Sequence, residues 1–372
     1  MPESHGIDAL DVNLDAFMAE DWQQRVRFFK GALSGFMSPI DGDDLAGLAM
    51  EDGVDSRIIT LTAEGYCRRD GPFVADSDFQ APGAWTLLVQ GVDRWIPEVA
   101  QLRRLVSFLP SWRFDDVMVS YATPGGGVGP HFDQYDVFLL QGLGRRTWHI
   151  GPTCDTTTPT DLSSGVPLVD PYQPIATYQA EPGDVLYIPP GVAHWGIAES
   201  ECLTFSLGFR ALSIADLMAR LTDHMLEKLD PGLLLEDRHS LVNTAKPGKL
   251  SDRYWHNARS AIDHAVAELD SGVWLAEQLS EISGDAALTP ETMPLPDRVG
   301  LRYVSSIVWQ TTGRELLVAV NGERYRYSKA VEPALIALTR SIPLSTQTLS
   351  HAEREVVTRL WSLGLLADWS SL

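Results

Sequence analysis

The feature that most constrains the fold is a series of short apolar segments, separated by glycine and proline turns, between Asp115 and Phe209. The segments at 137–140 and 185–188 are too short for ordinary helices. Pro182 and Gly183 occupy the two central positions that a type II turn prefers. Many short strands joined by such turns are typical of a β-sandwich or barrel. We therefore expect residues 1–210 to form one mainly β domain with a few helices.

The pattern becomes helical after residue 210. Apolar residues at helical spacing predict helices over 213–229, 252–269 and 273–282, and an earlier helix is predicted over 21–33. The helices of 211–290 have one apolar face, which can pack within the chain or against a second copy. A homodimer formed through residues 211–290 is one expectation, and an ordinary core within the chain is the alternative.

The last part, residues 291–372, mixes strands and helices. Asn321-Gly322 between the segments 316–320 and 323–327 predicts a type I′ hairpin, and helices are predicted over 330–340 and 350–363. This order is similar to a winged-helix unit, preceded by a linker at 284–296. From Leu295 onward there are 9 Lys+Arg and 7 Asp+Glu, so 9 − 7 = +2. Without a basic patch we expect protein contact and no direct nucleic-acid binding.

The whole chain is acidic, with 50 Asp+Glu against 29 Lys+Arg and a formal net charge of −21. Such a chain repels nucleic acid and anionic membranes and attracts basic partners, although acidity can also serve solubility alone. Cys67, Cys154 and Cys202 show no pairing pattern, which suits a reducing cytosol. No signal peptide and no apolar run as long as a membrane span are visible, so we expect a cytoplasmic protein without membrane contact.

His131-Phe132-Asp133 is a candidate half of a metal site. It follows the glycine-rich loop 124–130, and on a strand the side chains of His131 and Asp133 point the same way. His194 follows a predicted strand and the turn Pro189-Pro190-Gly191. Two imidazoles and a carboxylate hold one face of a ferrous ion and leave open positions for oxygen chemistry. Because H-x-D tripeptides are common, a purely structural role is the alternative.

Two adjacent arginines are candidates for binding an acidic co-substrate. The common co-substrate of such iron sites, 2-oxoglutarate, needs a buried cation for its far carboxylate, and the guanidinium fork suits this best. Arg145 and Arg146 enter a predicted strand, where only one can point inward. Arg146 shares its face with Trp148 and Ile150, which favours Arg146. The alternative is that both are solvated charges.

The predicted strand before the glycine-rich loop carries Asp116, Met118 and Ser120 on one face. An acid that points into a barrel is unfavourable unless it meets a cation, so an inward Asp116 predicts a cationic substrate side chain. Strand parity alone does not decide between the two faces, so the alternative is that this face points outward into solvent. Ser206 lies on the last strand of the series, where it can add a hydrogen bond.

Four segments carry a resemblance to a known family: PGGGVGPHFDQYD at 124–136, QGLGRRTW at 141–148, EPGDVLYIPPGVAH at 181–194 and SLGFR at 206–210. They resemble the JmjC-type ribosomal oxygenases, whose bacterial members are arginine hydroxylases acting on large-subunit ribosomal protein sixteen. The resemblance covers nearly the whole chain. It implies an α+β protein with a double-stranded β-helix (cupin/JmjC barrel) at 1–210, a helical dimerisation region at 211–290 and a winged-helix-like domain at 291–372.

The resemblance also implies roles for particular residues. The iron ligands would be His131, Asp133 and His194, and Arg146 would bind 2-oxoglutarate, with help from Ser120. The substrate arginine would be held by four residues: Asp116, Met118, Tyr135 and Ser206.

The reaction implied is hydroxylation of an arginine β-carbon in this basic ribosomal protein, with Fe(II), 2-oxoglutarate and O2. Two alternatives remain open. One is a JmjC hydroxylase or demethylase that acts on a histidine or lysine of a different basic protein. The other is a cupin scaffold that binds metal or a partner without turnover.

Overall fold

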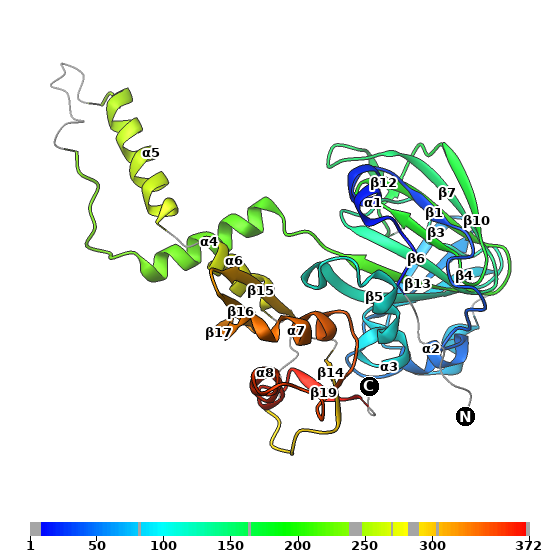
Figure 1. Cartoon of the computed structure of the whole chain (residues 1–372). Coiled ribbons are helices and arrows are strands. Elements are labelled where there is room, and N and C mark those ends of the chain that lie inside the picture. The colour runs from blue at the N-terminus through cyan, green and yellow to red at the C-terminus, as the bar shows by residue number, and fades with distance from the viewer. Residues whose placement is uncertain are drawn as a thin grey trace. The chain divides into compact units, whose positions relative to one another are not determined.

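The computed structural model describes residues 9–80, 83–162, 165–237, 248–268, 271–281, 290–302 and 305–369. The chain divides into two compact units (Figure 1). The first contains residues 1–211, 287–304 and 333–372, and the second contains residues 212–286 and 305–332. The division at 210 and 290 into three functional parts stays a prediction. No helix in the described ranges combines the length and the apolar character that a membrane crossing requires.

Two antiparallel sheets form the body of the first unit (Figure 1). The larger has eight strands in the order β1-β11-β6-β13-β5-β4-β2-β3, and the smaller has the order β10-β7-β12. The strands of the larger sheet are β1 (Arg27–Phe29), β2 (Ser56–Thr62), β3 (Gly65–Asp70), β4 (Ala84–Val89), β5 (Phe114–Ala122), β6 (Asp136–Leu143), β11 (Val185–Ile188) and β13 (Cys202–Phe209). Those of the smaller are β7 (Arg146–Thr153), β10 (Ala176–Ala180) and β12 (Val192–Ala198), and β8 (Thr160–Asp161) pairs with β9 (Leu168–Val169).

Strand parity decides what each face of the larger sheet contacts. On β6, Val137 and Leu139 pack with Trp148 and Ile150 of the smaller sheet. The alternate residues of β6 and their neighbours point the other way, into a second core covered by the helices α1 (Leu14–Glu20), α2 (Gly42–Leu48) and α3 (Pro97–Ala100). The eight-stranded sheet is therefore buried on both faces over its central strands, as continuous apolar runs require. The mainly β character predicted for residues 1–210 is confirmed.

The helix predicted over residues 21–33 is wrong. Residues 27–29 form β1, which pairs with β11 at the edge of the larger sheet. Phe28 packs against Tyr178 at 5.3 Å between ring centroids, while Phe29 lies 6.3 Å from Phe17. Two adjacent aromatic side chains thus enter two different cores, which a strand permits and a helix does not.

The second unit contains α4 (Ile214–Lys228), α5 (Asp252–Ala267), α6 (Ser271–Ser280) and a sheet of β15 (Ile307–Thr312), β16 (Glu315–Val320) and β17 (Glu323–Ser328). The three predicted helices are confirmed, although residues 269 and 282 lie outside the described ranges. The Ser213 hydroxyl accepts a hydrogen bond from the Asp216 amide and so caps α4. Asn321 and Gly322 have φ of 49° and 76°, which confirms the type I′ turn.

The remaining C-terminal elements are β14 (Arg298–Leu301), α7 (Glu332–Thr339), β18 (Leu344–Ser345), α8 (His351–Ser362) and β19 (Leu366–Asp368). The two helices predicted in this part are confirmed. Strands β18, β14 and β19 form a small sheet in that order. The predicted linker at 284–296 lies partly outside the described residues.

Candidate metal centre

The backbone brings the two halves of the predicted metal site together. His131 and His194 form an isolated antiparallel bridge, in which each amide donates to the other carbonyl at 3.0 and 2.7 Å. The amide of Gly191 donates to the carbonyl of Asp133 at 2.7 Å. The loop before β6 and the start of β12 are therefore hydrogen-bonded at the positions that carry the candidate ligands.

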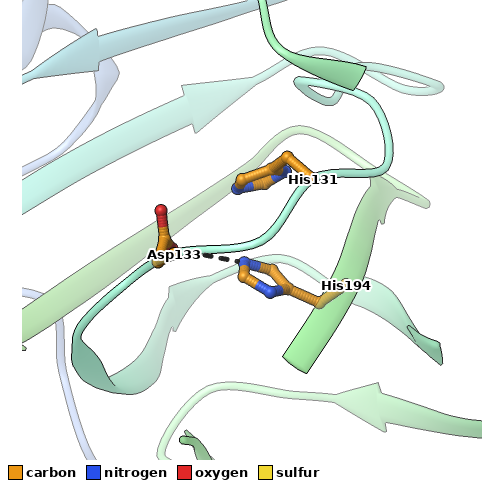
Figure 2. A group of neighbouring side chains, drawn as sticks. All are labelled: His131, Asp133 and His194. Atoms are coloured by element: carbon orange, nitrogen blue, oxygen red, sulfur yellow. Dashed lines mark ion pairs between the residues drawn. The ribbon is translucent and has the colours of Figure 1, made fainter. Parts of the chain in front are cut away.

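The three side chains converge on one point (Figure 2). A ligand atom from each of His131, Asp133 and His194 lies within 4.8 Å of the other two. The two imidazole centroids are 4.3 Å apart, and His194 Nε2 lies 3.6 Å from Asp133 Oδ2. Two nitrogens and one oxygen on the same side of a small space are the donor set of a non-haem iron site with open positions.

Both imidazoles are oriented by main-chain oxygens. His131 Nδ1 lies 2.9 Å from the carbonyl of Gly129, and His194 Nδ1 lies 2.9 Å from the carbonyl of Val192. A carbonyl can only accept, so Nδ1 carries the proton in each ring and Nε2 keeps its lone pair for a metal. Burial, together with the neighbouring His131, lowers the pKa of His194 to about 4, which keeps that ring neutral as a ligand must be.

Arg146 is a buried cation that lacks a full set of partners. Its Nη1 donates to Ser120 Oγ at 3.1 Å, and the guanidinium lies 5.5 Å from the ring centre of Trp148. Its Nε and Nη2 are buried without a hydrogen-bond partner among the residues that the structure describes. Burial of a charge in this state is unfavourable. A carboxylate would satisfy both nitrogens as a bidentate pair.

The neighbouring Arg145 differs from Arg146 in its exposure and in its partner. It is exposed, and its Nε lies 3.8 Å from Glu199 Oε2. Strand parity therefore places Arg146 inside and Arg145 outside, as the apolar neighbours of Arg146 indicate.

One cavity of about 380 Å³ connects the candidate ligands with Arg146. Met118, Ser120, Tyr135 and Ser206 all line it, as do the three candidate ligands. Asp116 is buried but is not part of the lining. Its Oδ2 accepts a hydrogen bond from Gln90 Nε2 at 2.8 Å, and burial raises the pKa of its carboxyl group.

The sequence reasoning missed several groups around this cavity. Arg57 and Arg68 line it from β2 and β3, and Trp148 packs on Arg146. The carbonyls that orient the imidazoles carry no side-chain signal, so a sequence cannot reveal them. Gln90 could have been found, because it continues the inward face of β4 that carries Thr86 and Leu88.

Comparison with known proteins gives the same picture. The model of the JmjC domain family matches residues 101–217. The ribosomal protein uL16 3-hydroxylase of Escherichia coli is 33% identical over 352 residues, which cover 92% of this chain and 93% of the relative. A probable ribosomal oxygenase of Haemophilus influenzae is 34% identical over 244 residues, covering 64% of this chain and 60% of the relative.

A solved structure extends the likeness to three dimensions. The ribosomal oxygenase YcfD from Escherichia coli, in complex with cobalt and 2-oxoglutarate, superposes with a TM-score of 0.79 at 30% identity. The match covers 96% of this chain and 99% of that one. With the two antiparallel sheets and the convergent His131, Asp133 and His194 in place, these similarities show that the chain belongs to the JmjC-domain ribosomal oxygenases, a family of 2-oxoglutarate-dependent enzymes.

Proposed function

We propose that this chain hydroxylates the β-carbon of an arginine in ribosomal protein uL16, using Fe(II), 2-oxoglutarate and O2. The observation that carries the proposal is the buried, incompletely paired guanidinium of Arg146 in the same cavity as the three convergent ligands. One end of the cavity suits a metal and the other suits a carboxylate. The choice of uL16 as the substrate rests on the Escherichia coli relative, whose name specifies uL16 3-hydroxylation.

His131, Asp133 and His194 would hold the metal on one face. Arg146 would bind the far carboxylate of 2-oxoglutarate, and Ser120, which already accepts from Arg146, would help to fix it. When bound, iron and 2-oxoglutarate supply the oxidising chemistry, in which O2 gives one oxygen atom to the substrate and one to succinate while CO2 is released. The protein contributes orientation and a cavity between two sheets that limits the access of water.

The substrate arginine would be recognised by four residues near this cavity: Asp116, Met118, Tyr135 and Ser206. A buried carboxylate and an aromatic ring are suitable partners for a guanidinium. The net charge of −21 favours encounter with a basic ribosomal protein. Action on such a protein would place the enzyme in the cytoplasm.

The second unit would serve assembly. Helices α4 and α5 have 15 and 16 residues, yet neither contains a buried side chain. Large apolar residues are exposed on both, including Ile214, Leu226, Trp255 and Ile262. We infer that a second copy of the chain covers them, which gives a homodimer through residues 211–290. The winged-helix-like part, residues 291–372, would contact protein.

A reaction with purified components tests the activity. The chain is supplied with ferrous iron, 2-oxoglutarate and recombinant uL16, and tandem mass spectrometry locates any added oxygen atom. We expect one oxygen on an arginine and one succinate per hydroxylation. His131→Ala should abolish both products.

Other outcomes would contradict the proposal in different ways. An oxygen on a histidine, or loss of a lysine methyl group, would assign the chain to another substrate. Iron binding without succinate release would make it a metal-binding scaffold.

A further inference from the structure

Asp116 lies at an irregularity in the larger sheet. On β13, Leu207 pairs with Val117 of β5 and Phe209 pairs with Phe114, so two residues of β5 face the single residue Gly208. Such a bulge re-aims the side chains around it and is common beside active sites. Here it lets a buried carboxylate approach Gly208 from β5.

Gly208 lies beside two groups that suit a guanidinium. A Cβ atom built on Gly208 would lie 3.8 Å from Asp116 Oδ1 and 4.0 Å from Cε2 of Tyr135. The Asp116 carbonyl oxygen would lie 3.9 Å away, so a methyl group at this position would make ordinary contacts and would occupy the place between the two groups. Tyr135 also lines the cavity that contains the candidate ligands, so this space adjoins the reaction site.

Gln90 fixes the carboxylate beside this space. The side-chain Nε2 of Gln90 donates to Asp116 Oδ2 at 2.8 Å, and the backbone amide of Gln90 donates to the Asp55 carbonyl at 2.9 Å. Asp116 Oδ1 accepts no hydrogen bond from the part of the chain that the structure describes. One oxygen is therefore held by Gln90 while the other faces Gly208.

The Tyr135 ring already has one guanidinium nearby. The Cζ of Arg210 lies 5.9 Å from the centre of this ring, and Arg210 Nε lies 2.5 Å from Asp115 Oδ2. A carboxylate of β5 and this ring thus hold an arginine of the chain itself. Asp116, the next residue, offers the same pair of chemical groups to an arginine from outside.

We propose that Gln90 and Gly208 determine the specificity for an arginine side chain. Gln90 is a positioning residue that orients Asp116, and Gly208 leaves the space in which the substrate guanidinium lies between Asp116 and Tyr135. The inference rests on the proposed function, because it assumes an arginine substrate. Neither residue is a candidate metal ligand or lines the cavity that contains Arg146, so we expect both to act on the protein substrate and not on 2-oxoglutarate.

The test compares Gln90→Leu and Gly208→Ala with the full-length wild-type chain. For each protein the KM for a uL16 peptide and the Kd for 2-oxoglutarate are measured, the latter by calorimetry with Mn²⁺ in place of iron. We expect the KM for the peptide to rise about tenfold or more in both variants, as loss of a charge-assisted contact predicts. The Kd for 2-oxoglutarate should stay at the wild-type value.

Two substitutions serve as matched controls. Gln179, like Gln90, donates to a carboxylate, Glu199 Oε1, at 3.0 Å, but it is exposed and outside the cavity. Gly47 lies in α2 with nothing within 4 Å of an added Cβ. Gln179→Leu and Gly47→Ala should leave both constants unchanged.

The results separate this inference from the proposed function. If the wild-type chain hydroxylates an arginine but both Gln90→Leu and Gly208→Ala keep the wild-type KM for the peptide, the inference about these two residues is overturned and the proposed function still holds. Equal weakening of peptide and 2-oxoglutarate binding would also overturn the inference, because the two residues would then serve only packing. If the wild-type chain hydroxylates no arginine, the proposed function itself fails.

Discussion

At the scale of single residues, the site combines groups that the chain itself leaves incomplete. Three ligand atoms converge within 4.8 Å, and two nitrogens of the buried Arg146 have no hydrogen-bond partner in the part of the chain that the structure describes. Unpaired buried polar groups are rare in folded proteins because each is unfavourable. Their presence together in one cavity indicates that bound molecules complete the site.

Arg146→Met should weaken the binding of 2-oxoglutarate about 100-fold, because it removes a bidentate charge-assisted pair from a buried position. Calorimetry with Mn²⁺-loaded protein measures the effect. Arg145→Met, one residue away and exposed, is the control and should bind like the wild type. Similar losses in both variants would show that Arg146 has no special role.

Asp93 gives a pH-dependent prediction. Burial raises its carboxyl pKa from 3.8 to about 6, although the group accepts a hydrogen bond from the Val117 amide. The folded state therefore binds the proton more tightly than the unfolded state. This group's contribution to stability is fully present below pH 4 and is lost as the pH rises to about 6, by as much as about 3 kcal/mol.

Urea unfolding at a series of pH values checks this prediction. Asp93→Asn keeps an acceptor for the Val117 amide and removes the titration, so its free energy of unfolding should fall less between pH 4 and 6 than that of the wild type. The exposed Asp52→Asn is the control and should follow the wild type. Parallel curves for Asp93→Asn and wild type would refute the assignment.

Much of the site was predictable from single residues, for a physical reason. Strand parity is strict, so the order of residues alone predicts that Arg145 and Arg146 do not share a face. The spacing of His131 and Asp133 also indicated that they converge, although the two residues lie in the loop before β6, where His131 forms an isolated bridge. The hydrogen bonds from Gly129 and Val192 were not predictable, because every residue has a carbonyl. The contact between Gln90 and Asp116 depends on which strands are neighbours, which parity does not specify.

At the scale of elements, local signals succeeded where the local sequence determines the backbone. The Asn321-Gly322 turn and the Ser213 cap were predictable because each needs particular residue types. The helix prediction for residues 21–33 failed because β1 forms through its pairing with β11, a strand more than 150 residues away in the sequence. Such distant pairing overrides local propensity.

Gly322→Ala should destabilise the β16–β17 hairpin. Gly322 has a φ of 76°, a conformation that costs an L-residue about 1 kcal/mol or more. Hydrogen exchange of the β16 and β17 amides measures the effect, and their protection should fall. Gly248→Ala, with nothing within 4 Å of an added Cβ, is the control and should leave it unchanged. Unaltered protection in Gly322→Ala would contradict the turn assignment.

At the scale of the whole molecule, the two units differ in how completely they bury their apolar residues. The first has continuous cores on both faces of its larger sheet. In the second, α4 and α5 expose apolar side chains along their length. This contrast is the basis for the proposed homodimer.

Sedimentation of the purified chain should therefore give the mass of two copies. Replacing Leu226 and Trp255 together by aspartate should yield single copies, because the charges would be buried in the interface. The same double change at two exposed positions of the first unit, Met37 and Val74, should leave the dimer intact. A wild-type chain that sediments as one copy at micromolar concentration would contradict the assembly.

The central claim is that the chain adds one oxygen atom to an arginine of uL16, and the mass of uL16 in the source organism tests it most directly. Ribosomes are purified from the wild-type strain, from a strain that lacks this chain, and from that strain complemented with the chain or with His131→Ala. The account predicts uL16 heavier by one oxygen, located on an arginine, in the wild-type and complemented strains only. An identical uL16 mass in all four strains would contradict it.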